Sequence, residues 1–451
     1  MSTPRLLSCF KAYDIRGRVP DELDEELAYK LGRAFAAQQG AKSVVVGRDV
    51  RSSSAQLSSA LSRGLADAGV RVLDVGLVGT EVVYFATSYL EADGGIMVTA
   101  SHNPADYNGM KLVGRRSVPL SGDAGLPELE RRCAWGELGP RAGGGFREER
   151  DVTEAYLDHL MGYVDLARLT PMKVVSDPGN GCAGPFVERL AGRLPLDLVK
   201  VLHEPDGTFP NGVPNPMLEE NRARTARAVR ESGAALGMAW DGDFDRCFFF
   251  DEGGNFVEGY YLVGLLAEAL LGQHPGAAVI YDTRLVWNTV EMVEAAGGRP
   301  VLSKCGHAFI KARMRAEDAL YGGEMSAHHY FRDFFYCDSG MIPWLLVLGR
   351  LSETGRPLSE LLGSRMARFP CSGEINRRIE DPDAVLDAVR RRYASRAESV
   401  DETDGISMSM GNWRFNLRRS NTEPLVRLNV ESRLDVELMW EKTTELLALL
   451  E

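Results

Sequence analysis

The sequence predicts an α/β protein with more than one domain, and two observations lead to this fold class. The chain has 451 residues, too many for a single hydrophobic core, so we expect three or four domains. One pattern, a β-branched run followed by a polar turn and a helix-like stretch, recurs at 44–49, 173–178 and 278–284. Short buried strands that alternate with helices indicate βαβ units and mostly parallel sheets. The recurrence predicts three related α/β domains.

Changes in composition predict the domain boundaries. Residues 136–150 are rich in Gly, Arg and Glu, which is typical of a linker, and a helix-like run follows over 152–169. Further boundaries are expected near 251–255 and near 365–371. We therefore expect four domains, over residues 1–150, 151–254, 255–366 and 367–451.

The last of these regions predicts a smaller α+β domain with an antiparallel sheet. After a first strand we expect a helix over 382–394, a hairpin around Gly411 and Asn412, a further strand, and a last helix over 436–450.

Composition and charge exclude several classes of protein. Hydrophobic residues make up 44% and charged residues 26% of the chain, as in ordinary globular proteins. No apolar run is long enough to span a membrane, and the N-terminus lacks the apolar core of a signal peptide. Seven scattered cysteines predict reduced thiols in a cytoplasmic protein. The net charge of −12 argues against a nucleic-acid surface, and we expect no membrane and no obligate protein partner.

Residues 99–104 read Thr-Ala-Ser-His-Asn-Pro and directly follow the apolar run Ile96-Met97-Val98. Loops past the ends of such strands form ligand crevices, where backbone amides hold phosphate oxygens. His102 and Lys111 flank Ser101 as proton carriers or charge partners. In isolation, the motif is better explained as an Asn-Pro turn with a capping serine. A Ser-His-Asp hydrolase is disfavoured because no Gly-x-Ser-x-Gly elbow is present.

Residues 241–246 place Asp241, Asp243 and Asp245 at alternate positions and end in Arg246. Mg²⁺ prefers several oxygen ligands, often with a substrate phosphate among them. The alternative, an acidic turn, is disfavoured by the apolar run 247–250, because unpaired charge beside a buried strand is costly. Together with Ser101, the three carboxylates indicate phosphoryl transfer.

Three further motifs carry weaker signals. Residues 323–328 offer a carboxylate, a hydroxyl and an imidazole, which suit a hydroxyl-rich ligand such as a sugar. Residues 304–311 add Lys304 and His307, and 418–422 combine a guanidinium with hydroxyls and an amide, as a phosphate site does. Each could instead be a polar surface loop.

In this order, the motifs at 99–104, 241–246, 323–328 and 418–424 resemble those of the α-D-phosphohexomutases, and most closely the bacterial phosphomannomutase/phosphoglucomutase branch. The resemblance runs from Phe10 to Arg427. It implies four domains around a central cleft. Three of these would be similar α/β domains with mixed, mostly parallel sheets, and the last a smaller C-terminal α+β domain.

The resemblance also implies roles for individual residues. Ser101 would be the phosphoserine, and Mg²⁺ would be bound by Asp241, Asp243, Asp245 and an oxygen at Ser101. Catalysis would involve Ser101 with His102, Lys111, Arg16 and Arg246. Substrate would be bound by Tyr13, Arg284, Lys304, His307, Glu324, Ser326, His328, Arg418, Ser420, Asn421, Thr422 and Arg427. A hexose 1,6-bisphosphate would activate the enzyme.

Three positions depart from the pattern of the family. Phe244 and Ala327 stand where many members have glycine, a change that could alter the shape of their loops. Arg284 stands where many members have lysine, and an arginine stays protonated, which argues against proton transfer there. Met325 argues against the phosphoglucosamine mutases, which tend to have glutamine at this position.

The resulting expectation is a phosphomannomutase that interconverts mannose 6-phosphate and mannose 1-phosphate and supplies GDP-mannose synthesis. A phosphoglucomutase or a dual-specificity enzyme is the alternative within the family. A sugar-phosphate binding protein is disfavoured because Ser101 and the three aspartates are intact. A phosphatase would be distinguished by the release of inorganic phosphate.

Overall fold

The chain forms two compact units, each made of two separate stretches of sequence. The structure, a computed structural model, describes residues 7–122, 125–419 and 425–450. The first unit comprises residues 1–256 and 333–355, and the second comprises residues 257–332 and 356–451. Each unit is described by itself below. The central cleft implied by the resemblance stays a prediction.

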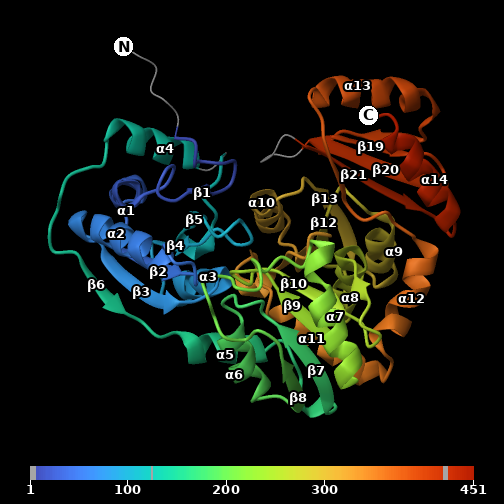
Figure 1. Ribbon diagram of the computed structural model, residues 1–451, viewed down its shortest axis with the longest axis horizontal. Coiled ribbons are helices and arrows are strands. Elements are labelled where there is room, and N and C mark those ends of the chain that lie inside the picture. Colours follow the sequence, from blue (N-terminus) through green and yellow to red (C-terminus); the bar gives the residue numbers. More distant parts are fainter. Residues whose placement is uncertain (1–6, 123–124, 420–424, 451) are drawn as a thin grey trace. The chain divides into compact units, whose positions relative to one another are not determined.

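The first sheet of the first unit is mixed, with strand order β1-β5-β4-β2-β3-β6 (Figure 1). Strands β4, β2, β3 and β6 run parallel, whereas β5 is antiparallel to both β4 and β1. The strands are β1 (Ile15–Arg18), β2 (Ser43–Arg48), β3 (Arg71–Leu77), β4 (Gly94–Val98), β5 (Tyr107–Gly114) and β6 (Phe146–Glu149). The helices of this region are α1 (Glu25–Gln39), α2 (Ser54–Asp67), α3 (Thr80–Tyr89) and α4 (Leu126–Trp135).

The second sheet of this unit has the order β11-β10-β9-β7-β8, with β8, β7 and β9 parallel and β10 antiparallel to β9. Its strands are β7 (Met172–Asp177), β8 (Leu196–Lys200), β9 (Leu236–Trp240), β10 (Cys247–Phe250) and β11 (Phe256–Val257). Its helices are α5 (Thr153–Met161), α6 (Gly184–Ala191) and α7 (Ala223–Ser232). Strand β16 (Cys337–Asp338) and helix α11 (Ile342–Thr354) also belong to this unit.

Helices α1 and α2 pack closely because two glycines remove the side chains between them. A Cβ atom on Gly32 would lie 2.3 Å from the Leu61 carbonyl oxygen, and one on Gly64 would lie 2.1 Å from that of Tyr29. Helix α1 begins where the Asp24 carboxylate accepts from the Leu27 amide at 2.8 Å. Apolar side chains of both helices share one core with β2 and β4, including Leu31, Leu61 and Val46.

The second unit begins with a mixed sheet in which β13, β12 and β14 are parallel and β15 is antiparallel to β14. These strands are β12 (Ala278–Asp282), β13 (Arg299–Ser303), β14 (Tyr321–Gly323) and β15 (His329–Phe331). The helices are α8 (Gly259–Leu271), α9 (Trp287–Ala295), α10 (His307–Glu317) and α12 (Leu358–Arg368).

The C-terminal part of the second unit is an antiparallel sheet with order β17-β21-β20-β19-β18, with α13 and α14 packed on it (Figure 1). Apolar side chains of both helices share one core with the strands, including Tyr393 of α13 and Met439 of α14. The elements are β17 (Ile375–Arg378), α13 (Pro382–Tyr393), β18 (Ser399–Asp401), β19 (Ile406–Ser409), β20 (Trp413–Arg419), β21 (Leu425–Ser432) and α14 (Val436–Leu447). The α+β prediction and the hairpin between β19 and β20 are confirmed.

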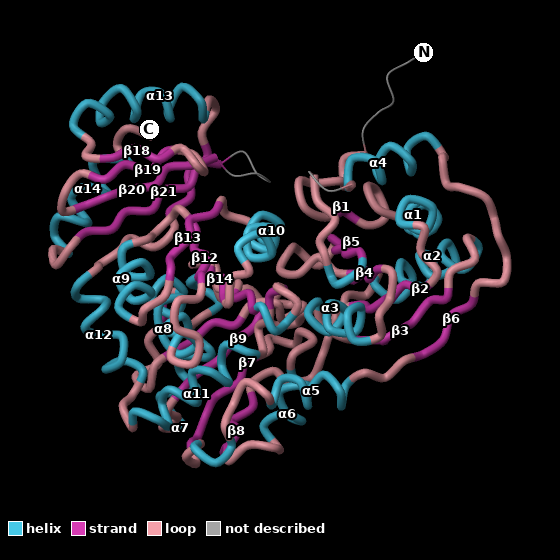
Figure 2. Tube along the Cα trace, turned by 180° about the vertical axis from the view of Figure 1, so that it is seen from behind, coloured by secondary structure: helices cyan, strands magenta, loops and turns pink. Residues whose placement is uncertain are grey.

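Three predicted segments differ from the structure. The end of the expected linker 136–150 forms β6, which pairs with β3 after a long loop from α4 (Figure 2). The expected helix over 152–169 ends at Met161, and a separate 3-10 turn begins where Asp165 accepts from the Ala167 amide at 3.1 Å. The expected last helix stops three residues early, at Leu447.

Within the described ranges, no helix combines the length and the apolar character needed to cross a bilayer. All seven cysteines are free thiols, and six of them are buried.

Glu81 of α3 is a fully buried carboxylate that holds the beginning of α11. It accepts from the Tyr156 hydroxyl, from the Ser339 hydroxyl at 2.7 Å, and from the backbone amides of Gly340 at 2.5 Å and Met341 at 3.2 Å. Ser339 in turn accepts from the Ile342 amide at 3.0 Å. Burial raises the pKa of Glu81 to about 8, although these four donors favour the ionised form.

Replacing this carboxylate should destabilise the first unit. Glu81→Ala leaves four buried donors without an acceptor, at about 1–3 kcal/mol each, so we expect a loss of about 3 kcal/mol or more. Because the folded-state pKa is raised, the contribution of Glu81 is complete below its unfolded pKa and is lost as the pH rises through about 8. Glu81→Gln mimics the neutral form.

Urea unfolding of wild type and Glu81→Gln at about pH 6 and about pH 9 tests this sign. The stability advantage of wild type over Glu81→Gln should shrink at the higher pH. An advantage that is constant or grows with pH would contradict the assignment.

Candidate functional site

Ser101 lies in the loop that directly follows β4, as predicted. Its side chain is buried, and its Oγ donates to Asp241 Oδ2 at 2.7 Å and lies 3.0 Å from His102 Nδ1. The backbone of Ser101 has φ = +49°, a left-handed conformation that is uncommon for a residue with a side chain. Such strain is held only where the surroundings fix it.

Arg51 holds this loop in place by hydrogen bonds to its backbone. Its guanidinium donates to four backbone carbonyls of the loop, those of Ser101 (2.8 Å), Asn103 (2.6 Å), Pro104 (2.7 Å) and Tyr107 (2.9 Å). The side chain is fully buried and lies 3.4 Å from the Asp49 carboxylate. Sequence reasoning missed Arg51, although its pair Asp49 lies in the polar turn after β2, part of the repeated pattern.

The three aspartates converge in the connection between the antiparallel strands β9 and β10. Carboxylate oxygens of Asp241, Asp243 and Asp245 lie within 4.8 Å of one another, and all three side chains are buried. Lys111 of β5 donates to Asp243 at 2.8 Å and also contacts Asp245. The register of β4 and β5 places Lys111 opposite Met97, beside the Ser101 loop.

This arrangement fits a divalent cation. Three buried carboxylates offer the hard oxygen ligands that Mg²⁺ prefers, and Asp243 Oδ1 has no hydrogen-bond partner among the described residues. Burial and the two neighbouring carboxylates raise the pKa of Asp241, although Arg246 opposes this. Burial by itself would lower the pKa of Lys111, but the charges of Asp243 and Asp245 outweigh burial and raise it. The Lys111 ammonium therefore stays protonated.

Arg246, His102 and Arg16 surround the serine with further nitrogen groups. Arg246 donates through Nε to Asp241 at 2.9 Å and contacts His102. Arg16 of β1 donates to Asn103 Oδ1 at 2.6 Å and to Asp14 at 2.8 Å. Desolvation and the Arg246 and Arg16 charges hold the pKa of His102 well below its usual range, so its imidazole is neutral. Tyr13 is half-buried just before β1.

Phe244 lies in the aspartate loop with a left-handed backbone conformation. It has φ = +46°, in the left-handed region that favours glycine. Its ring is fully buried and lies 5.3 Å, centroid to centroid, from that of Phe186. A Cβ atom on Gly79 would lie 2.3 Å from the Phe244 ring, so Gly79 makes room for it. The aromatic side chain thus adds packing behind the aspartates.

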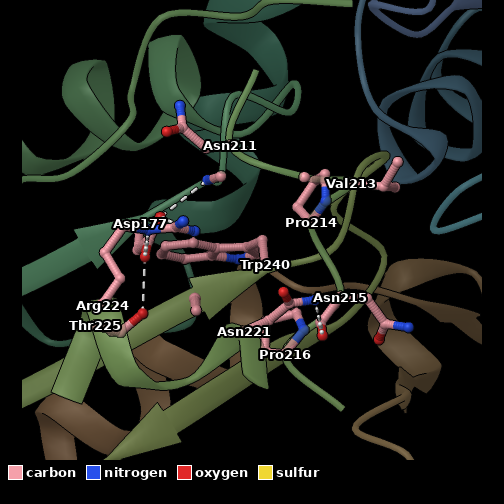
Figure 3. Close-up of a pocket in the computed structure, with 13 residues that line it drawn as sticks. Asp177, Asn211, Val213, Pro214, Asn215, Pro216, Asn221, Arg224, Thr225 and Trp240 are labelled. Carbon is pink, nitrogen blue, oxygen red and sulfur yellow. Dashed lines mark hydrogen bonds and ion pairs between the residues drawn. The ribbon is translucent and has the colours of Figure 1, made fainter. Parts of the chain in front are cut away.

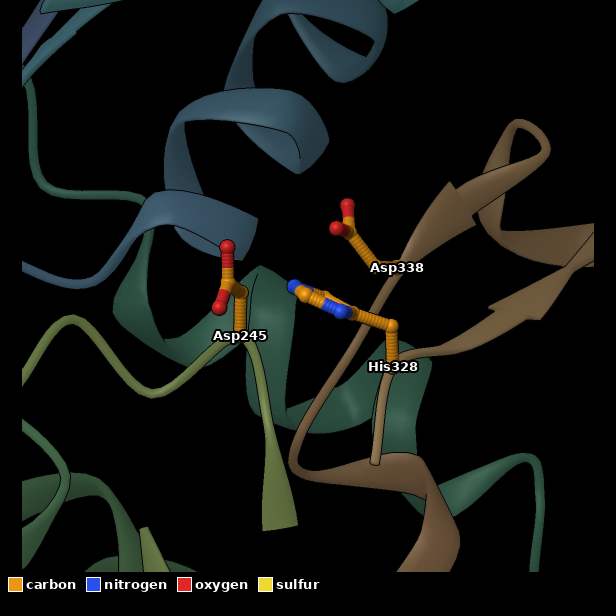
Figure 4. A group of neighbouring side chains, drawn as sticks. All are labelled: Asp245, His328 and Asp338. Carbon is orange, nitrogen blue, oxygen red and sulfur yellow. The ribbon is translucent and has the colours of Figure 1, made fainter. Parts of the chain in front are cut away.

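A fourth buried carboxylate of the first unit, Asp338 of β16, lies near the aspartate loop (Figure 4). An oxygen of Asp338 lies within 4.8 Å of one of Asp245. The next turn packs on the same loop, since a Cβ atom on Gly340 would lie 2.4 Å from the Phe244 carbonyl oxygen. Trp240 donates to the Gly340 carbonyl at 2.9 Å. Sequence reasoning missed this segment because it lies almost a hundred residues further along the chain.

A small pocket of the first unit lies beside Trp240 and is lined by residues such as Asp177, Asn211, Pro214 and Arg224 (Figure 3). The Asp177 carboxylate accepts from the Gly179 amide at 3.0 Å, from Thr225 at 2.8 Å and from Arg224 at 2.9 Å. None of the predicted site residues lines this pocket. Its proline-rich wall lies near the aspartate loop, since Pro214 Cγ would be 3.9 Å from a Cβ atom placed on Gly242.

In the second unit, Glu324 follows β14 and is buried. Its oxygens accept from the Gly306 amide at 2.9 Å, the Tyr330 hydroxyl at 2.6 Å and Arg284 at 3.3 Å. Burial raises the pKa of Glu324, although Arg284 opposes this. A carboxylate has about four lone-pair sites, so these contacts still leave capacity for a ligand hydroxyl.

Arg284 is buried, with 2% of its side chain exposed, and its guanidinium contacts three carboxylates. It donates to Asp282 at 2.7 and 3.0 Å, to Glu324 at 3.3 Å and to Glu374 at 3.3 Å. It also donates to Ser326 Oγ at 3.2 Å. With so many internal acceptors, Arg284 positions its neighbours, and a direct substrate contact stays a prediction.

The other predicted sugar-site residues surround Glu324 and the beginning of α10. His328 Nδ1 lies 3.6 Å from Glu324 and 3.5 Å from Ser326 Oγ. His307 is the first residue of α10, and Lys304 is exposed. Ala327 has φ = +68° and is buried, so it keeps the backbone that glycine adopts without strain.

The predicted phosphate site is described only in part. Arg418 of β20 and Arg427 of β21 are paired in register, and both contact Glu374 at 3.2 Å. Ser420, Asn421 and Thr422 lie outside the described residues. The structure thus brings Arg284, Arg418 and Arg427 together around Glu374, a residue that sequence reasoning missed.

Comparison with known proteins agrees with these motifs across the chain. Four models of the phosphoglucomutase/phosphomannomutase family match: alpha/beta/alpha domain I at residues 8–134, domain II at 154–254, domain III at 258–369, and the C-terminal domain at 374–442. The boundaries predicted above are not tested by these ranges and stay predictions.

Two curated relatives are the phosphomannomutases of Salmonella typhimurium, 57% identical, and of Escherichia coli, 56% identical. Each alignment covers 98% of this chain and 99% of the relative. A crystal structure of a phosphoglucomutase/phosphomannomutase family protein from Burkholderia thailandensis matches with a TM-score of 0.87 and 35% identity, over 97% of this chain and 96% of that one. The chain therefore belongs to the phosphoglucomutase/phosphomannomutase family.

Proposed function

We propose that the chain is a phosphomannomutase that interconverts mannose 6-phosphate and mannose 1-phosphate, and that its product supplies GDP-mannose synthesis. The observation that carries this proposal is the contact of Ser101 Oγ with Asp241 at 2.7 Å, beside two further buried aspartates. Full-length relatives that carry the name phosphomannomutase favour mannose over glucose as the substrate.

In the proposed reaction, phospho-Ser101 donates its phosphoryl group to the free hydroxyl of the hexose phosphate. The bond from phosphorus to Ser101 Oγ breaks, a bond to the sugar oxygen forms, and the hydroxyl proton leaves to a base. The resulting 1,6-bisphosphate turns over, and its other phosphoryl group returns to Ser101. Free hexose 1,6-bisphosphate would restore a dephosphorylated enzyme in the same way.

The residues of the first unit would act mainly by position and charge. Asp241, Asp243 and Asp245, with an oxygen at Ser101, would hold Mg²⁺, which would neutralise charge on the transferring phosphoryl group. Arg51 holds the serine loop through its carbonyls. Lys111, Arg246 and Arg16 supply the positive charge, and the neutral imidazole of His102 lies next to Ser101 Oγ.

Ser101 should carry the phosphoryl group in the active protein. Ser101→Ala should lower mutase turnover by roughly 10³-fold or more, because no nucleophile remains. Peptide mass spectrometry of active wild type should find phosphate on Ser101, and a trace of bisphosphate should restore dephosphorylated enzyme. The exposed Ser52 gives a control, Ser52→Ala, that should stay active. Unmodified Ser101 in fully active enzyme with no bisphosphate requirement would refute the role.

Activity should depend on Mg²⁺ through the three aspartates. Asp243→Asn removes a hard ligand and one counter-charge of Lys111, so turnover should fall by about 10²–10³-fold with little change in the unfolding midpoint. Isothermal titration should show weaker Mg²⁺ binding. Asp197→Asn, on the exposed face of β8, is the control. Full activity after treatment with EDTA would show that the metal assignment is wrong.

Glu324 should bind ring hydroxyls of the sugar. Glu324→Ala removes a charged acceptor, so KM should rise by about 10–100-fold, and turnover should fall because the intermediate must be bound again after it turns. Steady-state kinetics with both hexose phosphates measures this, and Glu294→Ala, an exposed change on α9, is the control. Unchanged KM and kcat with both substrates would contradict the assignment.

A further inference from the structure

Glu374 lies just before β17 and forms ion pairs with three arginines from separate parts of the second unit. It accepts from Arg284 at 3.3 Å, from Arg418 of β20 at 3.2 Å and from Arg427 of β21 at 3.2 Å. The side chain is only 7% exposed. Burial raises the pKa of Glu374, but the three guanidiniums outweigh burial and lower this pKa to about 2, so the carboxylate is ionised.

The contacts of Glu374 leave Arg418 with donors for a ligand. Glu374 accepts from Nη2 of Arg418, whereas Nε is buried and has no hydrogen-bond partner among the described residues. Arg418 is 4% exposed. A guanidinium has five N–H groups in a rigid plane, so holding Nη2 against Glu374 fixes the directions of the remaining N–H groups, Nε among them. A buried donor without an acceptor is costly, and a ligand oxygen would satisfy it.

The same carboxylate connects the arginines to the sugar-binding loop. Arg284 bridges Glu374 and Glu324, so buried ion pairs run from Glu324 through Arg284 and Glu374 to Arg418. The backbone of Arg284 is also fixed, because Arg414 of β20 donates to the Arg284 carbonyl at 2.9 Å and to the Thr283 carbonyl at 3.0 Å. Arg414 is itself paired with the buried Glu431 at 2.8 Å. The backbone that carries the Arg284 bridge is therefore held by β20.

We propose that Glu374 is a positioning residue that orients Arg418 and Arg427 for the substrate phosphate and couples them, through Arg284, to Glu324. This proposal rests on the proposed function for the identity of the sugar, but not for the binding of phosphate. Arg284 suits the bridging role better than lysine, because a planar fork reaches three carboxylates at once whereas an ammonium is a single point charge.

The test compares Glu374→Gln with Glu374→Asp and with wild type. Glu374→Gln keeps the shape but removes the charge, and an amide cannot accept from three guanidiniums. KM for mannose 1-phosphate and for glucose 1-phosphate should rise by about tenfold or more, alike for both sugars, since the contact is to phosphate. The kcat should change less, and Glu374→Asp should recover part of the loss. Glu402→Gln, which breaks an exposed pair with Arg390, is the matched control.

A second comparison separates positioning from simple loss of stability. Arg418→Ala alone should raise KM. In the Arg418→Ala background, Glu374→Gln should raise KM by much less than it does in wild type, because the two residues act as one unit. Purely additive effects, an unchanged KM, or tighter binding in Glu374→Gln would overturn the proposal. Tighter binding would mean that Glu374 competes with the phosphate.

Inorganic phosphate gives a readout that does not depend on the sugar. Isothermal titration should show weaker binding of inorganic phosphate by Glu374→Gln than by wild type or Glu402→Gln, at equal unfolding midpoints. If wild type turns over neither hexose phosphate, the proposed function fails, and the phosphate titration still decides the role of Glu374. Equal affinity of the three proteins for phosphate would refute that role.

Discussion

The Ser101 site depends on the pairing of Lys111 with Asp243 and Asp245. Three carboxylates buried within 4.8 Å of one another repel, and burial alone would favour their neutral forms. Lys111 reaches them from β5, and Arg246 reaches Asp241 from the end of the aspartate loop. Because Lys111 lies beside β4 and the aspartates follow β9, this pairing also brings the serine loop of one sheet to the aspartate loop of the other. The hydrogen bond from Ser101 to Asp241 follows from it.

In the second unit, buried carboxylates are paired with an arginine. Glu324, Asp282 and Glu374 are buried carboxylates, and Arg284 contacts all three. The Arg284 guanidinium links the loop that contains Glu324 with Glu374, the residue before β17, in one network. The Arg414–Glu431 pair continues this network into β20 and β21, and Glu431 also accepts from the Val286 amide at 2.8 Å, before α9. Buried ion pairs thus connect the described residues of the predicted sugar and phosphate sites, whereas an exposed ion pair would contribute little.

Much of the fold and the site motifs could be predicted from the sequence because they are local signals. The apolar runs before Ser101 and Asp241 predicted β4 and β9, and the spacing of the aspartates predicted their convergence. Arg51, Glu81 and Glu374 could not be predicted, because their partners lie far away in sequence and only the folded sheets bring them together. The same holds for β6. Its sequence, Phe-Arg-Glu-Glu, is mostly exposed and does not predict a strand, and it forms one by pairing with the edge of β3. The effect of Phe244 and Ala327 on their loops could not be predicted from the sequence; in the structure both have a positive φ, in the left-handed region that favours glycine.

The most direct test of the account is to follow mannose 1-phosphate by ³¹P NMR with the wild-type chain, Mg²⁺ and a trace of hexose 1,6-bisphosphate. If Ser101 passes its phosphoryl group between the two positions of the sugar, the signal of mannose 6-phosphate should grow while that of mannose 1-phosphate falls, and no inorganic phosphate should accumulate. Accumulation of inorganic phosphate would instead indicate a phosphatase, and unchanged mannose 1-phosphate would indicate a protein that binds without turnover. Either result would contradict the account.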